Sequence, residues 1–213
     1  MKEAIDFILN IQEHLTTFTS AYGPLVYGLL FLIIFCETGL VVTPFLLGDS
    51  LLFAVGAVAA DPVSGLNIWL AGLIILVAAL IGDTVNYWIG NKFGSWMLRT
   101  FPRIVKPSHI EKTNEFYQRF GGKTIIIARF VPIVRTFAPF VAGTGNMDYK
   151  RFMFFNVIGA ALWVVTILPA GWFFGNIPIV KKNFELVVLG IIAFSLLPMV
   201  IEILRAKYKR PDK

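Results

Sequence analysis

Five apolar stretches dominate this sequence and constrain its fold more than any other feature. They span residues 24–60, 66–90, 124–143, 152–175 and 184–204. A helix that crosses a bilayer needs about 20 apolar residues. Hydrophobic residues make up 57% of the chain and charged residues only 15%, against about 45–50% and about 25% in soluble domains. The sequence therefore predicts an all-α polytopic membrane protein, with one membrane domain over residues 1–213.

Basic residues set the expected orientation of this domain in the membrane. The segment 91–123 carries Lys92, Arg99, Arg103, Lys106, Lys112, Arg119 and Lys123. The tail 205–213 is also basic, whereas the turn at 61–66 has no basic residue. Because cytoplasmic loops are enriched in lysine and arginine, we expect 91–123 to be a cytoplasmic amphipathic segment and the C-terminus to be cytoplasmic.

The apolar stretches then divide into two kinds. Residues 66–90, 152–175 and 184–204 have the length of single transmembrane helices. Residues 124–143 have cytoplasmic flanks on both sides and prolines within, which predicts a re-entrant hairpin. Residues 24–60 break at "TPFLLGDS" and are interpreted as a second hairpin that dips from the outside.

The N-terminal half leaves one alternative open. Residues 1–20 are amphipathic and predict an interfacial helix. If that helix is cytoplasmic, residues 24–60 form a single broken span instead of a hairpin. The order of elements repeats, however: an amphipathic helix, a broken apolar run and a crossing helix occur in each half. Such an inverted repeat of discontinuous helices is a transporter architecture.

Ionisable residues inside the apolar stretches are the strongest functional signal. Glu37, Asp49, Asp83, Arg129 and Arg135 all lie there. Each charge costs about 2.5–3.5 kcal/mol at the centre of a membrane helix. They must therefore pair with one another, face water or bind a charged ligand. If the two hairpin tips meet, the acids of the first face the arginines of the second.

Helix-breaking residues accompany these charges. Pro44 and Gly48 lie near the acids, and Pro132 and Pro139 lie near the arginines. Prolines remove backbone donors and interrupt helices, and interrupted backbone at membrane depth is tolerated only in protein or beside a wet cavity.

The arginines would lie on opposite faces of a continuous helix, because six positions separate Arg129 from Arg135. A break at Pro132 lets both turn inward.

This constellation predicts anion binding. Guanidinium groups grip phosphate with two donors, so Arg129 and Arg135 are the candidate substrate ligands. Glu37 and Asp49 are the candidate proton carriers. Asp83 is expected either to pair with an arginine or to line a vestibule. Buried ion pairs that only fix the docking of the hairpins remain an alternative. Asn156, Gly159 and Trp163 are interpreted as packing residues.

Several other classes of function lack a signal in the sequence. One cysteine and two histidines predict no metal site, and no phosphate-binding loop or nucleophile elbow suggests a cofactor or an enzyme. The net charge of +6 follows the expected membrane topology, so no nucleic acid is expected as a partner. A homo-oligomer is compatible with the sequence.

Three motifs resemble the DedA family of bacterial inner-membrane proteins. They are "ETGLVVTPFLLGDS", "GDTVNYWIGNKFG" and "ARFVPIVRTFAPFVAGTGNMDYKRF", followed by "FNVIGAALW". The resemblance implies two opposed re-entrant hairpins, a bacterial inner-membrane location and movement of phospholipids or undecaprenyl phosphate that depends on the proton motive force. It also implies relatedness to lipid-scramblase domains. The family's sensitive acids correspond to Glu37 and Asp49, and its sensitive arginines to Arg129 and Arg135. Leu47 stands where the family often has a proline.

The sequence thus predicts a transporter of a phosphate-bearing lipid. A proton-coupled cation or drug antiporter and a non-transporting membrane organiser remain alternatives.

Overall fold

The computed structural model describes residues 22–39, 47–100 and 107–177, together with Thr17, Val180 and Gly190. All regular structure within these residues is helical. The expected helices at 1–20 and 184–204 fall outside the described residues, apart from Thr17 and Gly190, which are helical. The basic tail 205–213 and Pro44 fall outside them as well.

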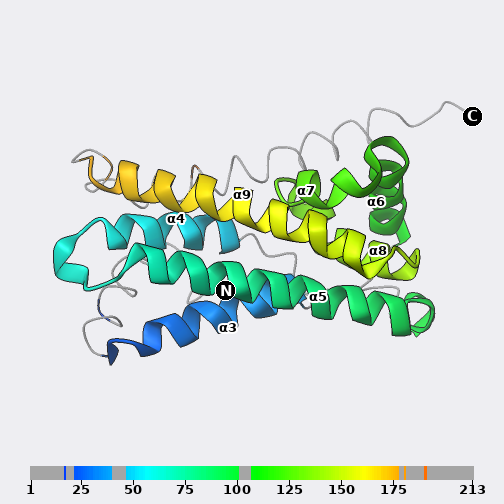
Figure 1. Ribbon diagram of the computed structural model, residues 1–213, viewed down its shortest axis with the longest axis horizontal. Coiled ribbons are helices and arrows are strands. Elements are labelled where there is room, and N and C mark those ends of the chain that lie inside the picture. The colour runs from blue at the N-terminus through cyan, green and yellow to red at the C-terminus, as the bar shows by residue number, and fades with distance from the viewer. Residues whose placement is uncertain are drawn as a thin grey trace, which may run out of the picture.

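Two long helices run the length of the molecule. These are α5 (Ile68–Thr100) and α9 (Tyr149–Gly175), about 50 and 40 Å long at 1.5 Å per residue. Figure 1 shows them side by side along the long axis. By length and composition, Ile68–Gly94 and Tyr149–Gly175 can each cross a membrane. The expectation of helices over 66–90 and 152–175 is confirmed, and α5 extends ten residues beyond its expected end at residue 90.

Both long helices begin at a polar capping residue. The side chain of Asn67 accepts hydrogen bonds from the backbone N–H groups of Trp69 and Leu70, at 2.9 and 3.1 Å. Asp148 accepts from the N–H of Arg151 at 3.0 Å. These side chains satisfy donors that have no partner within the first turn of a helix. The starting points of α5 and α9 are therefore encoded locally.

Shorter helices occupy the two ends of this pair. Helices α3 (Leu25–Gly39) and α4 (Leu47–Ala59) lie toward the end that carries the turn η1 (Pro62–Ser64), as Figure 1 shows. They are about 22 and 20 Å long, which is less than the hydrocarbon thickness of about 30 Å. The opposite end carries α6 (Pro107–Phe120), η2 (Gly121–Lys123), α7 (Thr124–Ala128) and α8 (Pro132–Thr144). Helix α6 matches the expected amphipathic helix.

The chain breaks between α7 and α8, where the sequence predicts an interruption. Val131 is extended, with φ −119° and ψ 104°, and Pro132 is the first residue of α8. The residue before a proline is driven out of the helical region, and proline fits the first helical position because it needs no donor there. Pro139 behaves differently from the expectation: α8 continues through it.

Glycines allow close backbone contacts within two groups of helices. In the first group, α3, α5 and α8 pack together. A Cβ on Gly39 would lie 3.3 Å from Cα of Gly82, and a Cβ on Gly90 would lie 3.0 Å from Cα of Phe140. Gly94 allows a further close contact on α5, because a Cβ there would meet the side chain of Thr144.

The second group contains α4 and α9. A Cβ on Gly56 would lie 2.8 Å from the backbone N of Trp172, and a Cβ on Gly171 would lie 2.9 Å from Cα of Phe53. Helix α7 also approaches α9, because a Cβ on Gly159 would lie 3.2 Å from Cα of Ile126. These helices therefore form a second tightly packed unit.

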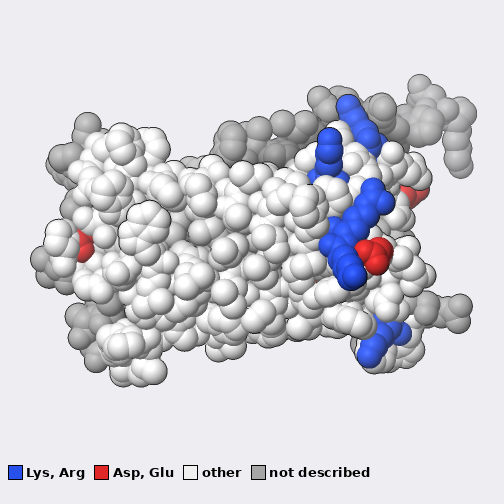
Figure 2. All heavy atoms as spheres, in the orientation of Figure 1, with Lys and Arg blue, Asp and Glu red and all other residues white. Residues whose placement is uncertain are grey.

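The two groups meet along α5 and α9, where the packing is looser. An apolar groove of about 560 Å³ lies between these helices. Its lining comes from both: Ile68, Trp69, Gly72, Leu73 and Leu76 from α5, and Ala161, Val164, Val165, Leu168, Pro169 and Trp172 from α9. Figure 2 shows a long uncharged middle section on this face and basic side chains gathered at the α6 end. An uncharged band of this kind suits contact with lipid.

Candidate functional site

Arg135 lies at the centre of an ionic cluster that joins three short helices. Its two terminal nitrogens contact different carboxylates: Nη1 donates to Asp49 Oδ1 at 2.8 Å, and Nη2 donates to Glu37 Oε1 at 2.9 Å. Glu37 is near the end of α3, Asp49 is in the first turn of α4, and Arg135 is in the first turn of α8. The ends of the short helices thus meet at this guanidinium.

Trp163 of α9 forms the floor of the cluster. Its indole N–H donates to Asp49 Oδ1 at 2.7 Å. The Arg135 guanidinium carbon lies 4.5 Å from the centroid of the indole ring, within the range of a cation–π interaction. Trp163 therefore contacts the acid and the base of one ion pair at once, and its own side chain is fully buried.

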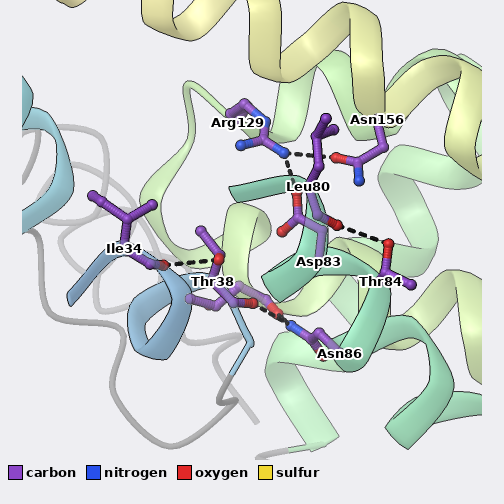
Figure 3. Close-up of polar contacts among 9 residues, drawn as sticks. Ile34, Thr38, Leu80, Asp83, Thr84, Asn86, Arg129 and Asn156 are labelled. Atoms are coloured by element: carbon purple, nitrogen blue, oxygen red, sulfur yellow. Dashed lines mark hydrogen bonds and ion pairs between the residues drawn. The ribbon is translucent and has the colours of Figure 1, made fainter. Parts of the chain in front are cut away.

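Arg129 belongs to a second, more deeply buried cluster. It forms an ion pair with Asp83 of α5 and donates to Asn156 Oδ1 of α9 at 2.7 Å. Figure 3 shows the guanidinium between these two side chains. The Arg129 side chain is 3% exposed and the Asp83 side chain is 5% exposed. This confirms the expectation that Asp83 pairs with an arginine.

Asn86 connects the helices that carry the first cluster. Its amide nitrogen donates to the backbone carbonyls of Thr38, at 3.1 Å, and Thr136, at 2.9 Å. Thr38 follows Glu37, and Thr136 follows Arg135. Asn86 therefore fixes α3 and α8 beside each other at the point where their charged side chains meet (Figure 3 shows the Thr38 contact). It is fully buried.

Gly48 leaves room for the ion pair next to it. A Cβ at this position would lie 2.7 Å from Glu37 Oε2 and would also collide with Nη2 of Arg135. Glycine is the residue that permits α4 to begin this close to the cluster. The predicted role of Gly48 near the acids thus gains a steric reason.

The two clusters differ in their access to the surface. Asp49 has a side chain 21% exposed, whereas those of Arg135 and Glu37 are 10% and 11% exposed. Among the described residues, Oε2 of Glu37 and Nη1 of Arg129 are buried without a hydrogen-bond partner. Asp49 is therefore the most exposed member of the first cluster, and the second cluster is the more deeply buried of the two.

The sequence analysis identified the charged residues that meet in the structure, but it expected different pairs among them. It expected two acids to face two arginines. Both acids, Glu37 and Asp49, instead contact Arg135, and Arg129 takes Asp83 as its partner. The reason is geometric: Arg129 precedes the break and lies against α9, whereas Arg135 follows it within α8.

Three polar residues of the site were not predicted as such. Asn156 and Trp163 were interpreted as packing residues, and Asn86 was not singled out. Asn156, Gly159 and Trp163 are spaced three and four residues apart on one face of α9. A buried amide and an indole N–H on the same face of a membrane helix need partners, and that requirement was the available signal.

These features define a helical membrane protein whose short, interrupted helices meet at buried charges. Residues 43–173 match the VTT domain. Over 204 residues the chain is 55% identical to Protein DedA of Escherichia coli, covering 95% of this chain and 93% of that protein. These matches show that the chain belongs to the DedA family, as the motifs predicted.

More distant relatives are also named as membrane proteins. An uncharacterized membrane protein of Mycobacterium tuberculosis is 36% identical over 195 residues, covering 90% of this chain and 86% of that one. The inner membrane protein YqjA of Escherichia coli is 33% identical over 165 residues, covering 74% and 71%. No solved structure matches this chain.

Proposed function

We propose that this protein translocates a phosphate-bearing lipid, undecaprenyl phosphate or a phospholipid, across the bacterial inner membrane and that protons drive the step. The supporting observation is the Arg135 cluster. A guanidinium that can grip phosphate is held by two carboxylates between helix ends, and one of these carboxylates, Asp49, is 21% exposed. Arginine presents the donor geometry that phosphate oxygens require.

The charge of the cluster supports a link to protons. Two carboxylates, Glu37 and Asp49, surround one guanidinium, so the ionised cluster carries a formal charge of −1. The second cluster, Arg129 with Asp83, is neutral. An excess negative charge is costly in a low-dielectric site. Uptake of one proton would make the first cluster neutral.

Competition for Arg135 supplies a coupling mechanism. The lipid phosphate and the carboxylates of Glu37 and Asp49 are alternative partners for the same nitrogens. Protonation of the acids weakens their hold on Arg135 and frees it for phosphate. Loss of the protons restores the carboxylates, which displace the phosphate. Headgroup binding and proton binding therefore favour each other at this site.

Arg129 stays a predicted phosphate ligand under this proposal. Its contacts with Asp83 and Asn156 close it off in the described state. It could reach a headgroup only after the pair with Asp83 separates. We assign Asp83 the role of holding Arg129 until then.

The helical arrangement supports a path for the lipid. We propose that α3 with α4, and α7 with α8, are the two opposed re-entrant hairpins of an inverted repeat, since α3 and α4 are each too short to span the hydrocarbon. The basic end with α6 would face the cytoplasm. The apolar groove between α5 and α9 provides a surface for the lipid tail while the headgroup crosses.

Purified protein in proteoliposomes provides the test. Flipping of a labelled phosphate lipid should depend on an imposed pH gradient and should be lost in Arg135→Gln. Glu37→Gln should retain part of the flipping and lose its pH dependence. A matched control is Arg119→Gln, because this arginine is exposed on α6 and distant in sequence from the cluster. Equal flipping by the wild type and Arg135→Gln would contradict the proposal.

The negative charge of the cluster also favours a second candidate, a proton-coupled cation antiporter. The carboxylates of Glu37 and Asp49 could hold a cation in exchange for protons. This function predicts pH-gradient-driven cation flux in proteoliposomes with no lipid movement. Lipid flipping without cation flux would exclude it.

A further inference from the structure

A second cavity lies at the basic end of the molecule, apart from the Arg135 cluster. It has a volume of about 290 Å³ and forms where α6, η2, the end of α8 and the start of α9 come together. Its lining consists of Asn114, Tyr117, Gly121, Gly122, Val141, Ala142, Gly145, Met147 and Arg151. Neither the proposed transport step nor the motifs of the sequence assign it a role.

Two polar side chains of the lining, Arg151 and Asn114, are exposed and have no hydrogen-bond partner within the described residues. Arg151 uses its backbone N–H to complete the Asp148 cap, but within the described part of the chain its guanidinium makes no hydrogen bond or ion pair. The side-chain amide of Asn114 likewise has no partner there. Among the described residues that line the cavity, Arg151 is the only charged one and none is a carboxylate.

The backbone forms part of the cavity wall. Helix α9 begins at Tyr149, between the lining residues Met147 and Arg151, and the carboxylate of Asp148 already caps this helix start, so the attraction for an anion comes from side chains. Gly121 adopts φ +57° and has no atom within 4 Å of the position of a Cβ. At this point the cavity wall is therefore formed by the backbone and not by a side chain.

Charges of both signs surround the cavity, with the positive ones in excess on the face shown in Figure 2. Exposed cations, Lys123 and Lys150, lie at the same end of the molecule as the acids Glu115 and Asp148. Clustered positive charge raises the local concentration of anions. The inner wall is Tyr117, whose hydroxyl is already used, donating to the backbone carbonyl of Ala138 at 3.0 Å.

From these observations we propose that the cavity is a phosphate-binding site, with Arg151 as its principal ligand and Asn114 as its second donor. The phosphate belongs to the headgroup of an anionic lipid or is free in solution. In either case this is a site distinct from Arg135, and it does not depend on the proposed transport function.

The test measures binding to the full-length protein. Inorganic phosphate is titrated against protein in neutral detergent, and the shift in melting temperature is recorded. In parallel, nanodiscs of phosphatidylcholine with and without phosphatidylglycerol are compared by native mass spectrometry for retained lipid. The variants are Arg151→Gln and Asn114→Leu, and the matched control is Lys150→Gln, which removes an exposed charge next to Arg151 but not from the lining.

We expect Arg151→Gln to weaken binding at least about tenfold, because a charge-assisted hydrogen bond to the anion is lost. Asn114→Leu should weaken it less, and Lys150→Gln should change it less than about threefold. A response to inorganic phosphate identifies a site for the free anion, and a response to phosphatidylglycerol alone identifies a site for a lipid headgroup. Equal losses in Arg151→Gln and Lys150→Gln, or no loss in Arg151→Gln, would overturn the proposal.

The transport proposal and the phosphate-site proposal can be refuted independently of each other. Arg135→Gln should abolish lipid flipping and leave phosphate binding at Arg151 intact. Loss of phosphate binding in Arg135→Gln would place the anion at the central cluster instead and would refute the second site.

Discussion

Trp163 and Asp49 share a hydrogen bond at the same oxygen that Arg135 uses. The indole N–H donates to Asp49 Oδ1 at 2.7 Å, and Arg135 donates to that oxygen at 2.8 Å. One carboxylate oxygen thus accepts hydrogen bonds from a neutral donor and from a charged donor. The centroid of the Trp163 ring lies 4.5 Å from the guanidinium carbon of Arg135. The indole therefore positions the acid and the base relative to each other.

Replacing Trp163 by phenylalanine separates the two contributions of the indole. Trp163→Phe keeps an aromatic ring beside Arg135 but removes the donor to Asp49. A hydrogen bond to a charged group contributes about 1.5–3 kcal/mol, so we expect lipid flipping to fall about tenfold or more. Trp163→Leu should fall further. Flipping assays in proteoliposomes measure this, with Trp88→Phe as the control, because Trp88 is an exposed tryptophan of α5 outside the lining of the apolar groove.

Adding one methyl group at Gly48 should disrupt the cluster. In Gly48→Ala the new Cβ would collide with the Glu37 carboxylate and Arg135, so we expect loss of flipping and a lower melting temperature. Gly28→Ala is the matched control, because this glycine of α3 has no atom within 4 Å of a Cβ. Alanine there should be neutral or slightly stabilising, by up to about 1 kcal/mol. Full activity in Gly48→Ala would contradict the described packing.

The buried pair of Arg129 and Asp83 should show strong coupling in a double-mutant cycle. Arg129→Gln or Asp83→Asn alone leaves one buried charge without its partner, which costs about 3–5 kcal/mol. The double variant leaves two neutral amides, so we expect it to recover at least about 2 kcal/mol of the summed loss. Denaturant unfolding in detergent gives these values. The exposed residues Glu115 and Arg119 of α6 provide a control cycle, which should be additive.

Tyr117 should make stability depend on pH in the alkaline range. Burial raises the pKa of the Tyr117 hydroxyl above its ordinary value, and nearby Asp83 raises it further. The folded protein therefore holds this proton more tightly than the unfolded chain, whose tyrosines titrate near about 10. This contribution is complete below about pH 10 and is lost as pH rises toward the folded-state pKa, by about 1.4 kcal/mol per pH unit.

A comparison with Tyr117→Phe isolates this effect from the titration of lysines. The variant loses the hydrogen bond to the carbonyl of Ala138, about 1 kcal/mol, at every pH. It should lack the additional decline above about pH 10. Parallel slopes for the wild type and the variant would show that Tyr117 is not the responsible group.

The sequence predicted those parts of the fold that local rules determine. The long helices α5 and α9 follow from apolar length, whereas their first residues, which the caps at Asn67 and Asp148 determine, were not predicted. The break before Pro132 follows from the steric effect of proline on Val131. Pro139 shows the limit of that rule, because a proline inside a helix can be accommodated where neighbouring elements support the backbone.

The partners of the charged residues could not be predicted from the sequence alone. The buried acids and arginines were expected to pair, face water or bind a charged ligand, but the sequence did not show that Arg135 takes both Glu37 and Asp49. That choice depends on how closely α3, α4 and α8 approach one another. Glycine contacts between residues that are far apart in the sequence set these distances. The buried donors of Asn86 and Trp163 complete the pairing, and their targets lie 48 to 50 and 114 residues away in the sequence.

The grouping of the helices has a mechanical consequence. Arg135–Asp49 and Arg129–Asp83 each join one tightly packed group to the other, whereas Arg135–Glu37, the bonds of Asn86 and Trp163–Asp49 lie within a group. A proton added to either aspartate thus removes an electrostatic attraction between the groups and leaves the glycine contacts inside each group unchanged. Any movement along the α5–α9 boundary would have to break these ion pairs and would also disturb the apolar core to which both groups contribute.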